Sequence, residues 1–261
     1  MDLGLKGKAA LVLAGGGGLG RAIGKALAAE GASVAIADID EAAAKCSVEE
    51  ITATGATALS FVWDLADLTA IEKQVGTIES RLGSIDVLVN ITGGPPPTPA
   101  SGQTSDLWNK QFQAMVLPVI ALTDRILPGM KSKGWGRIIT STSSGVVAPI
   151  PNLGISNALR LSLVGWSKTL AREVARDGIT ANIILPGRIG TDRIRFLDES
   201  KANREGRTIQ SVTAESTGSI PMGRYGRPEE YADAVAFLAS DRASYITGSV
   251  IRIDGGLIPS I

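Results

Sequence analysis

The sequence contains no histidine and only one cysteine, Cys46, in 261 residues. A Ser-His-Asp triad and the familiar histidine-containing metal clusters are therefore excluded, and Cys46 has no partner for an internal disulfide. Lysine plus arginine and aspartate plus glutamate number 26 each, so the formal net charge is zero. This balance argues against binding to nucleic acid or to an anionic membrane surface.

Long apolar runs are also missing. No run approaches the roughly 20 residues that a transmembrane helix needs, and the first residues do not have the pattern of a signal peptide. We therefore expect a cytoplasmic protein with no membrane partner. Apolar residues still make up 44% of the chain, which is enough for a large core.

The sequence alternates short apolar runs with longer segments of helical period. Parallel strands that are covered by helices on both faces have such uninterrupted apolar runs. The pattern predicts an α/β fold with a doubly wound, Rossmann-type parallel sheet of seven strands, in a single domain spanning 1–261. The predicted strands are residues 9–13, 34–37, 58–62, 87–89, 138–139, 183–185 and 250–253.

Two segments depart from this rhythm. Residues 107–130 are helix-like, but Pro118 has no backbone N–H, so we expect a kink there. Residues 188–221 are polar and are predicted to form an irregular lid above the carboxyl ends of the strands. Arg188, Arg193 and Arg195 lie in this segment and are candidates for contact with an anionic substrate, although we expect them to face solvent.

A glycine-rich turn follows the first predicted strand. Gly15, Gly17 and Gly20 have the G-x-G-x-x-G spacing, directly after a strand and at the start of a helix. In this arrangement the backbone approaches a pyrophosphate closely, and helix N-terminal amides point at its charge. The turn predicts a nicotinamide dinucleotide as the cofactor.

Asp38 stands at the end of the second predicted strand. An acid at this position accepts hydrogen bonds from the adenosine ribose and repels a 2′-phosphate. The glycine loop also has no lysine or arginine to attract that phosphate, so NAD(H) is favoured over NADP(H). Alternatively, Asp38 caps the following helix, a role for which Asp40 is equally suited.

Five ordered segments resemble motifs of the short-chain dehydrogenase/reductase family, and the last two resemble its 3-oxoacyl-acyl-carrier-protein reductase-like branch. The first segment departs from the T-G-x-x-x-G-x-G motif at Leu13 and Ala14, and the second keeps the first and last positions of N-N-A-G. The five segments are residues 13–20, 90–93, 186–191, 223–230 and 245–256.

The resemblance implies hydride exchange between a nicotinamide and a small carbonyl or alcohol substrate, with thioesters among the candidates. It also implies a homo-oligomer, dimer or tetramer, and the apolar stripe Leu159, Leu163 and Leu170 is a candidate contact. Asp64 matches the acid that contacts the adenine. The implied cofactor-binding residues are Gly15, Gly17, Gly18, Leu19, Gly20, Asp38, Asp64, Leu65, Asn90, Gly93, Arg160, Pro186, Gly187, Ile189 and Thr191.

The catalytic residues of the family are Asn, Ser, Tyr and Lys, and only the serine is matched, by Ser143. Ser156 stands at the tyrosine position, Arg160 at the lysine position and Met115 at the asparagine position. A serine hydroxyl is a weak acid, and an arginine stays charged and cannot pass on a proton. Ser143, Ser156 and Arg160 are our candidate catalytic residues.

Three functions are consistent with this substituted site. In the first, an oxidoreductase binds the substrate oxygen through its serines, while water, Asp192 or Tyr225 supplies the proton. In the second, the chain binds NAD(H) without turnover, as a regulatory or scaffold protein. In the third, a similar sheet binds S-adenosylmethionine for methyl transfer, which the Pro186-Gly187 turn argues against.

Two of the candidate residues also have structural interpretations. The Ser143 hydroxyl is suited to satisfy backbone groups at a strand end. Arg160 is suited to pair with Asp106 or with another acid across a subunit contact.

Overall fold

Seven parallel strands form one sheet in the computed structural model, which describes residues 2–261. The strand order β3-β2-β1-β4-β5-β6-β7 confirms the predicted doubly wound, Rossmann-type architecture. This order reverses between β1 and β4, where ligands bind in folds of this kind. The strands are β1 (Ala9–Leu13), β2 (Ser33–Asp38), β3 (Ala58–Val62), β4 (Val87–Asn90), β5 (Gly136–Ser141), β6 (Ile179–Pro186) and β7 (Val250–Ile253).

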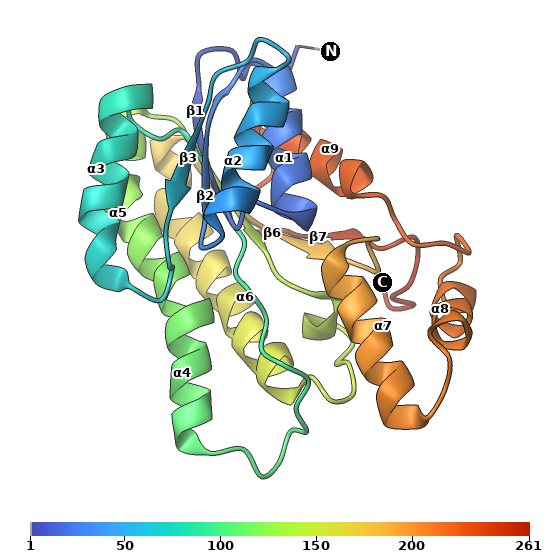
Figure 1. Cartoon of the computed structure of the whole chain (residues 1–261). Helices are drawn as coiled ribbons and strands as arrows, with labels where there is room; N and C mark the ends of the chain where they lie inside the picture. The colour runs from blue at the N-terminus through green and yellow to red at the C-terminus, as the bar shows by residue number, and fades with distance from the viewer. Residues whose placement is uncertain (1) are drawn as a thin grey trace.

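Helices cover both faces of the sheet. The α-helices are α1 (Gly18–Ala29), α2 (Glu41–Thr52), α3 (Ile71–Leu82), α4 (Ser105–Met115), α5 (Leu117–Lys133), α6 (Gly154–Val174), α7 (Asp192–Glu205), α8 (Ile209–Gly218) and α9 (Pro228–Ala239). Figure 1 shows α1 and α9 together on one side of the sheet, and α3 and α5 on the other. Short 3-10 segments are η1 (Leu68–Ala70), η2 (Ser144–Val146), η3 (Ala175–Asp177) and η4 (Asp241–Ala243).

The two helical layers explain why the strands have uninterrupted apolar runs. All five residues of β1 are buried. Val12 packs into the core under α1 and α9, whereas Leu11 and Leu13 pack into the core under α3, α5 and α6. Successive side chains point to opposite faces, and both faces are covered, so neither face tolerates polar residues.

The expected kink at Pro118 is a break between two helices. The helix α4 ends at Met115, Val116 has φ −111° and ψ −56°, and α5 begins at Leu117 with Pro118 in its first turn. Proline is tolerated at this position because the first N–H groups of a helix have no partner within the helix.

Residues 188–221 contain two helices, α7 and α8, so the prediction of irregular structure is wrong. The Thr208 hydroxyl caps α8 by accepting a hydrogen bond from Ser211 N. Within α7 only Asp198 and Ala202 are buried. A helix without an apolar stripe gives no periodic signal in the sequence. Both helices project beyond the sheet, at the same end of the molecule as α4 (Figure 1).

The leucine stripe of α6 is buried inside the chain. Leu159, Leu163 and Leu170 are 8%, 1% and 7% exposed, and they pack against the chain's own helices and strands. These three leucines are therefore not available for the contact between subunits that the sequence suggested. No helix among residues 2–261 is long and apolar enough to cross a membrane.

Candidate functional site

The predicted site residues gather along the carboxyl edge of the sheet. Three neighbouring hollows lie there, at the ends of β2 and β3, at the glycine turn, and between α6 and α7. Asp38, Asp64, Leu65 and Gly93 line the first, Gly17, Gly18 and Thr191 line the second, and Ser143, Ser156, Arg160, Pro186 and Gly187 line the third.

Two of the three glycines in the G-x-G-x-x-G spacing have no room for a Cβ. A Cβ at Gly20 would lie 2.1 Å from Ala14 O, so only glycine allows α1 to begin so close to β1. A Cβ at Gly15 would lie 2.9 Å from Ile36 Cγ2. By contrast, a Cβ at Gly17 would meet no atom within 4 Å, because Gly17 faces open space.

The open face of the turn fits a dinucleotide. Gly17 is the N-cap of α1 and provides no side-chain cap, so the first N–H groups of the helix remain free for an anion. Thr191 lies opposite Gly18, where a Cβ would approach the Thr191 side chain to 3.4 Å. Leu19 packs inward against the core beneath α1. The turn therefore has the space and the amides that a pyrophosphate needs.

Asp40, and not Asp38, caps the helix that follows β2. The Asp40 carboxylate caps α2 by accepting a hydrogen bond from Ala43 N at 3.0 Å. Asp38 instead accepts hydrogen bonds from Gly16 N at 2.9 Å and from Asp40 N at 3.0 Å. Its carboxylate thus lies against the glycine turn and lines the neighbouring hollow.

The hollow at the ends of β2 and β3 holds the predicted adenine-side residues. Asp64 is exposed, and its Oδ1 accepts a hydrogen bond from Ala66 N at 2.9 Å. Gly93 and Met115 line the opposite wall. Met115 is 2% exposed and ends α4, so its side chain contributes packing and no hydrogen-bond donor.

Two predicted cofactor residues lie beneath the surface of these hollows. Asn90 is fully buried at the end of β4, and its Nδ2 donates to Thr140 Oγ1 at 3.2 Å. Ile189 is 4% exposed and pairs with Gly226 in an isolated parallel bridge. Both residues support the edge on which the hollows lie.

The third hollow, the α6–α7 pocket, has a volume of about 420 Å³ and brings the three candidate catalytic residues together. Ser156 is in the first turn of α6 and 6% exposed, and Arg160 follows one turn later at 9% exposed. Ser143 caps η2 by accepting a hydrogen bond from Gly145 N. Its hydroxyl oxygen therefore satisfies a backbone group, as the structural interpretation of Ser143 predicted. This hydrogen bond leaves the Ser143 hydroxyl proton available to the pocket.

Arg160 is held by backbone groups rather than by an acid. Its Nη2 donates to Thr92 O at 3.2 Å and to Gly93 O at 3.0 Å. The alternative pairing of Arg160 with Asp106 is not made, and Asp106 is exposed at the start of α4. Burial and, second, the positive charge of Arg193 lower the pKa of Arg160 to about 10. Arg160 therefore stays charged at neutral pH.

Asp192 and Tyr225 do not line the α6–α7 pocket. Both line the hollow at the glycine turn instead. Asp192 is exposed and pairs with Arg195, and the Tyr225 hydroxyl donates to Asp198 Oδ2 at 2.5 Å. Burial and this hydrogen bond raise the pKa of Tyr225. Neither residue is placed to give a proton to a substrate at Ser156.

Arg193 is exposed, as expected, but its guanidinium reaches the α6–α7 pocket. Its Nη2 donates to Pro95 O at 3.0 Å, in the loop that follows β4. Arg188 and Arg195 are each paired with an acid. Arg193 is the second residue after the Pro186–Thr191 turn and lies in the first turn of α7. This proximity to the turn is the one sequence signal for its position.

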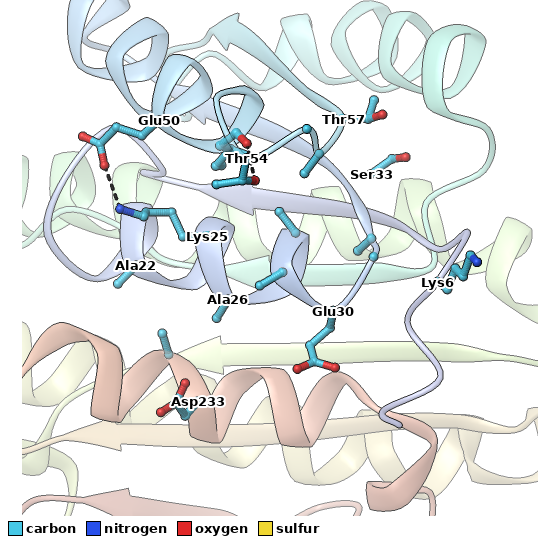
Figure 2. Close-up of a pocket in the computed structure, with 18 of the residues that line it drawn as sticks. Lys6, Ala22, Lys25, Ala26, Glu30, Ser33, Glu50, Thr54, Thr57 and Asp233 are labelled. Atoms are coloured by element: carbon cyan, nitrogen blue, oxygen red, sulfur yellow. Dashed lines mark hydrogen bonds and ion pairs between the residues drawn. The ribbon is translucent and has the colours of Figure 1, made fainter. Parts of the chain in front are cut away.

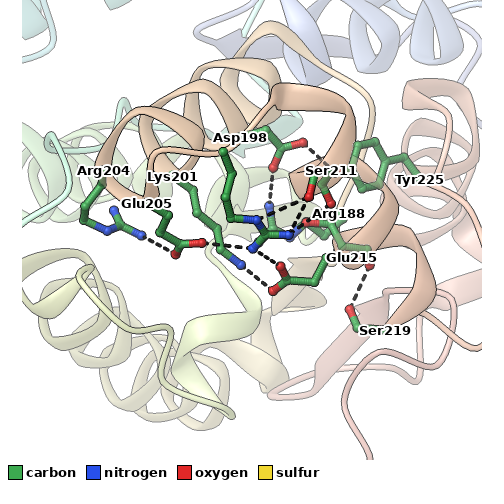
Figure 3. Close-up of polar contacts among 11 residues, drawn as sticks. Arg188, Asp198, Lys201, Arg204, Glu205, Ser211, Glu215, Ser219 and Tyr225 are labelled. Carbon is green, nitrogen blue, oxygen red and sulfur yellow. Dashed lines mark hydrogen bonds and ion pairs between the residues drawn. The ribbon is translucent and has the colours of Figure 1, made fainter.

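Asp198 is a site-supporting residue that the sequence did not reveal. Its carboxylate is 3% exposed and accepts hydrogen bonds from Arg188 at 3.0 Å and from Tyr225 at 2.5 Å. Figure 3 shows it within a network of polar contacts that joins α7 to α8. In the same network Glu215 contacts Lys201, and these contacts hold the two helices together beside the pocket.

We expect Asp198→Asn to loosen the α7–α8 segment. The amide cannot replace the ionic hydrogen bond to Arg188, and the loss is about 2 kcal/mol for a hydrogen bond to a charged group. Hydrogen exchange should show reduced protection across α7 and α8, and limited proteolysis should cleave there sooner. Asp192→Asn is the matched control, because its exposed pair with Arg195 adds little stability. Equal protection in both variants would contradict the supporting role of Asp198.

A larger hollow of about 950 Å³ lies near the opposite edge of the sheet. Figure 2 shows it beside α1, with Lys25 paired to Glu50 at 3.0 Å across one rim. Its wall includes residues that precede β1, β2 and β3, such as Lys6, Ala32 and Thr57. None of the predicted site residues lines this larger hollow. The volume of a hollow therefore does not identify the candidate site.

Comparisons with known proteins identify relatives of this chain. Residues 13–258 match the family model described as Enoyl-(Acyl carrier protein) reductase. The chain is 37% identical to 3-oxoacyl-acyl-carrier-protein reductase from Escherichia coli (strain K12) over 254 residues, covering 97% of this chain and 98% of that protein.

Two solved structures have the same fold. One is YwfH, an NADPH-dependent reductase involved in bacilysin biosynthesis, with a TM-score of 0.93 and 30% identity over 97% of this chain and 99% of that one. The other is L-sorbose reductase from Gluconobacter frateurii in complex with NADPH and L-sorbose, with a TM-score of 0.94 and 28% identity over the whole of both chains. The chain therefore belongs to the short-chain dehydrogenase/reductase family of NAD(P)-dependent oxidoreductases.

Proposed function

We propose that this chain is an NAD(H)-dependent enzyme that interconverts a ketone and a secondary alcohol at an altered catalytic site. The substrate class resembles that of 3-oxoacyl-acyl-carrier-protein reductase, and it includes thioesters. The residues that would hold the cofactor are those at the glycine turn, at the ends of β2 and β3, and at the Pro186–Thr191 turn. Ser143, Ser156 and Arg160 are the proposed catalytic residues.

One observation carries the proposal. The cofactor hollows and the α6–α7 pocket adjoin one another at the switch point of the sheet, where the strand order reverses between the neighbouring strands β1 and β4. Gly93 belongs to the first hollow, and its carbonyl binds Arg160, which lines the α6–α7 pocket. A dinucleotide along the edge would therefore end beside the candidate catalytic residues.

The bound cofactor supplies or accepts a hydride, and the chain must orient the substrate and manage charge and proton. The Ser143 and Ser156 hydroxyls, which both line the pocket, would donate hydrogen bonds to the substrate oxygen. Arg160 provides a fixed positive charge that stabilises negative charge developing on that oxygen. Since no tyrosine lines the pocket, water is the proposed source of the proton, and the chemical step is expected to be slow.

The alternative is a regulatory or scaffold protein that binds NAD(H) without turnover. The observation in its favour is that position 156 carries a serine, whose hydroxyl group is a poor proton donor. Under this alternative the α6–α7 pocket binds no reacting group, and Arg160 serves only to tie α6 to the loop after β4.

Titration with NADH and NADPH, followed by a turnover screen, tests the proposal. We expect NADH to bind at micromolar concentration and to be oxidised by at least one ketone or β-keto thioester. The rate should fall in Ser143→Ala. If NADH binds but no compound in the screen oxidises it above the Ser143→Ala background, the regulatory alternative is supported. Failure of both cofactors to bind would refute both functions.

Asp38→Asn is expected to relax the preference for NADH over NADPH by about tenfold, or 1.4 kcal/mol. The amide keeps a hydrogen-bond acceptor and removes the charge that repels a 2′-phosphate. The dissociation constants of both cofactors should be measured. Asp40→Asn is the matched control, since asparagine caps α2 as well as aspartate does and the preference should not change. An unchanged ratio in Asp38→Asn would remove the basis for assigning NAD(H).

A further inference from the structure

The α6–α7 pocket holds an excess of positive charge. Its one acidic lining residue is Glu205, whereas its basic lining residues are Arg160, Arg188, Arg193, Lys201 and Arg204. Three of these pair with carboxylates: Arg188 with Asp198 at 3.0 Å, Lys201 with Glu215 at 2.5 Å, and Arg204 with Glu205 at 3.5 Å. Within residues 2–261, neither Arg160 nor Arg193 has such a partner.

The two unpaired arginines converge on one small region beside Gly94. A Cβ at Gly94 would lie 2.9 Å from Arg193 Nη2 and 3.7 Å from Arg160 Nη2. Arg193 is close enough for its positive charge to lower the pKa of Arg160, and Arg160 is also nine-tenths buried. A bound anion between the two guanidinium groups would offset this repulsion.

Hydrogen-bond donors in the region remain free. Arg160 uses Nη2 for two backbone carbonyls, and Arg193 uses Nη2 for Pro95 O. A guanidinium has five N–H donors in a planar fork, which suits the oxygens of a carboxylate or phosphate. In addition, α6 begins at Gly154 without a side-chain cap, so its positive end adds to the potential of the pocket.

We propose that Arg160 and Arg193 bind a carboxylate or phosphate group of the substrate in the α6–α7 pocket. This inference rests on the proposed function and narrows it. The substrate is then a small keto or hydroxy compound that carries an anionic group near the reacting carbon. The carbonyl lies toward Ser143 and Ser156, and the anionic group lies toward Arg193, with Arg160 between them. A volume of about 420 Å³ suits a small molecule.

Binding of matched charged and neutral compounds tests the inference. The probes are acetoacetate with methyl acetoacetate, and dihydroxyacetone phosphate with dihydroxyacetone. Each is titrated by calorimetry with and without NADH. We expect the charged member of at least one pair to bind about tenfold or more tightly than its neutral partner. No preference in either pair would overturn the inference.

Arg193→Gln and Arg195→Gln form the matched variants. Both residues lie in the first turn of α7, but Arg195 is exposed and paired with Asp192. Arg193→Gln should abolish the preference for the charged compound, with NADH affinity within about twofold of the native value, and Arg195→Gln should keep the preference. Weaker NADH binding in Arg193→Gln with an unchanged preference would assign Arg193 to the cofactor phosphates and refute the inference.

The two proposals fail in distinguishable ways. If NADH is oxidised by neutral ketones as fast as by charged ones, the proposed function stands and the anionic substrate is refuted. If NADH does not bind at all, the proposed function is refuted, and the titrations without cofactor still report on the arginine pair.

Discussion

The double variant Ser156→Tyr with Arg160→Lys is expected to reduce a ketone with NADH at a rate at least about 100-fold higher than that of the native chain. A positioned general acid contributes roughly 10²-fold to 10⁴-fold. Residue 156 lines the α6–α7 pocket, and residue 160 lies one turn later on the same face of α6. A lysine there would lower the pKa of the introduced phenol and make it a competent acid. Steady-state kcat for a ketone that the native chain accepts, or for a β-keto thioester, measures the effect.

Ser156→Phe with Arg160→Lys is the control for this gain. It introduces the same bulk into the pocket without a hydroxyl group. Thermal melting of all variants shows whether each remains folded. Equal rates for the phenylalanine and tyrosine variants would show that proton donation does not limit the reaction. A native rate as high as that of the tyrosine variant would show that the serine and arginine already suffice.

Gly20→Ala is expected to abolish cofactor binding and to destabilise the fold by about 3 kcal/mol. The added Cβ would lie 2.1 Å from Ala14 O, and both partners belong to backbone that cannot move independently of β1 and α1. The start of α1 must then shift away from the strand, and the turn that approaches the pyrophosphate is lost. Urea denaturation gives the change in unfolding free energy, and NADH titration gives the loss of affinity.

Gly17→Ala separates these two effects. Its Cβ meets no atom within 4 Å, and the backbone is extended at φ −147° and ψ 173°, which any residue adopts. Stability should therefore change by less than about 0.5 kcal/mol. NADH affinity should still fall about tenfold, because the methyl group occupies the space that the pyrophosphate needs. A Gly17→Ala variant with native affinity would contradict the placement of the pyrophosphate.

The sheet and the glycine turn could be predicted because their signals are local. A strand buried on both faces must be apolar throughout, as β1 is, and a close approach such as that of Gly20 to Ala14 permits only glycine. These constraints act on single residues or short runs. They are therefore visible in the sequence without knowledge of the tertiary contacts.

The remaining features depend on contacts between distant segments. The leucine stripe of α6 indicates a buried face, but it does not show whether the covering surface belongs to the same chain. Asp198 is a charged residue on a polar helix, and it is buried where α7 packs against Arg188, Tyr225 and α8. Arg193 is exposed like its neighbours. Its proposed role depends on the direction of its long side chain, which extends toward the loop after β4.

Asp38 and Asp40 are only two residues apart but have separate contacts. Asp40 alone caps α2, whereas Asp38 contacts the glycine turn and the hollow beside it. A single substitution at Asp38 can therefore change the charge presented to the cofactor while the start of α2 stays intact. Under the proposed function, the preference for NADH can therefore change through one residue, while the Asp40 carboxylate still caps α2.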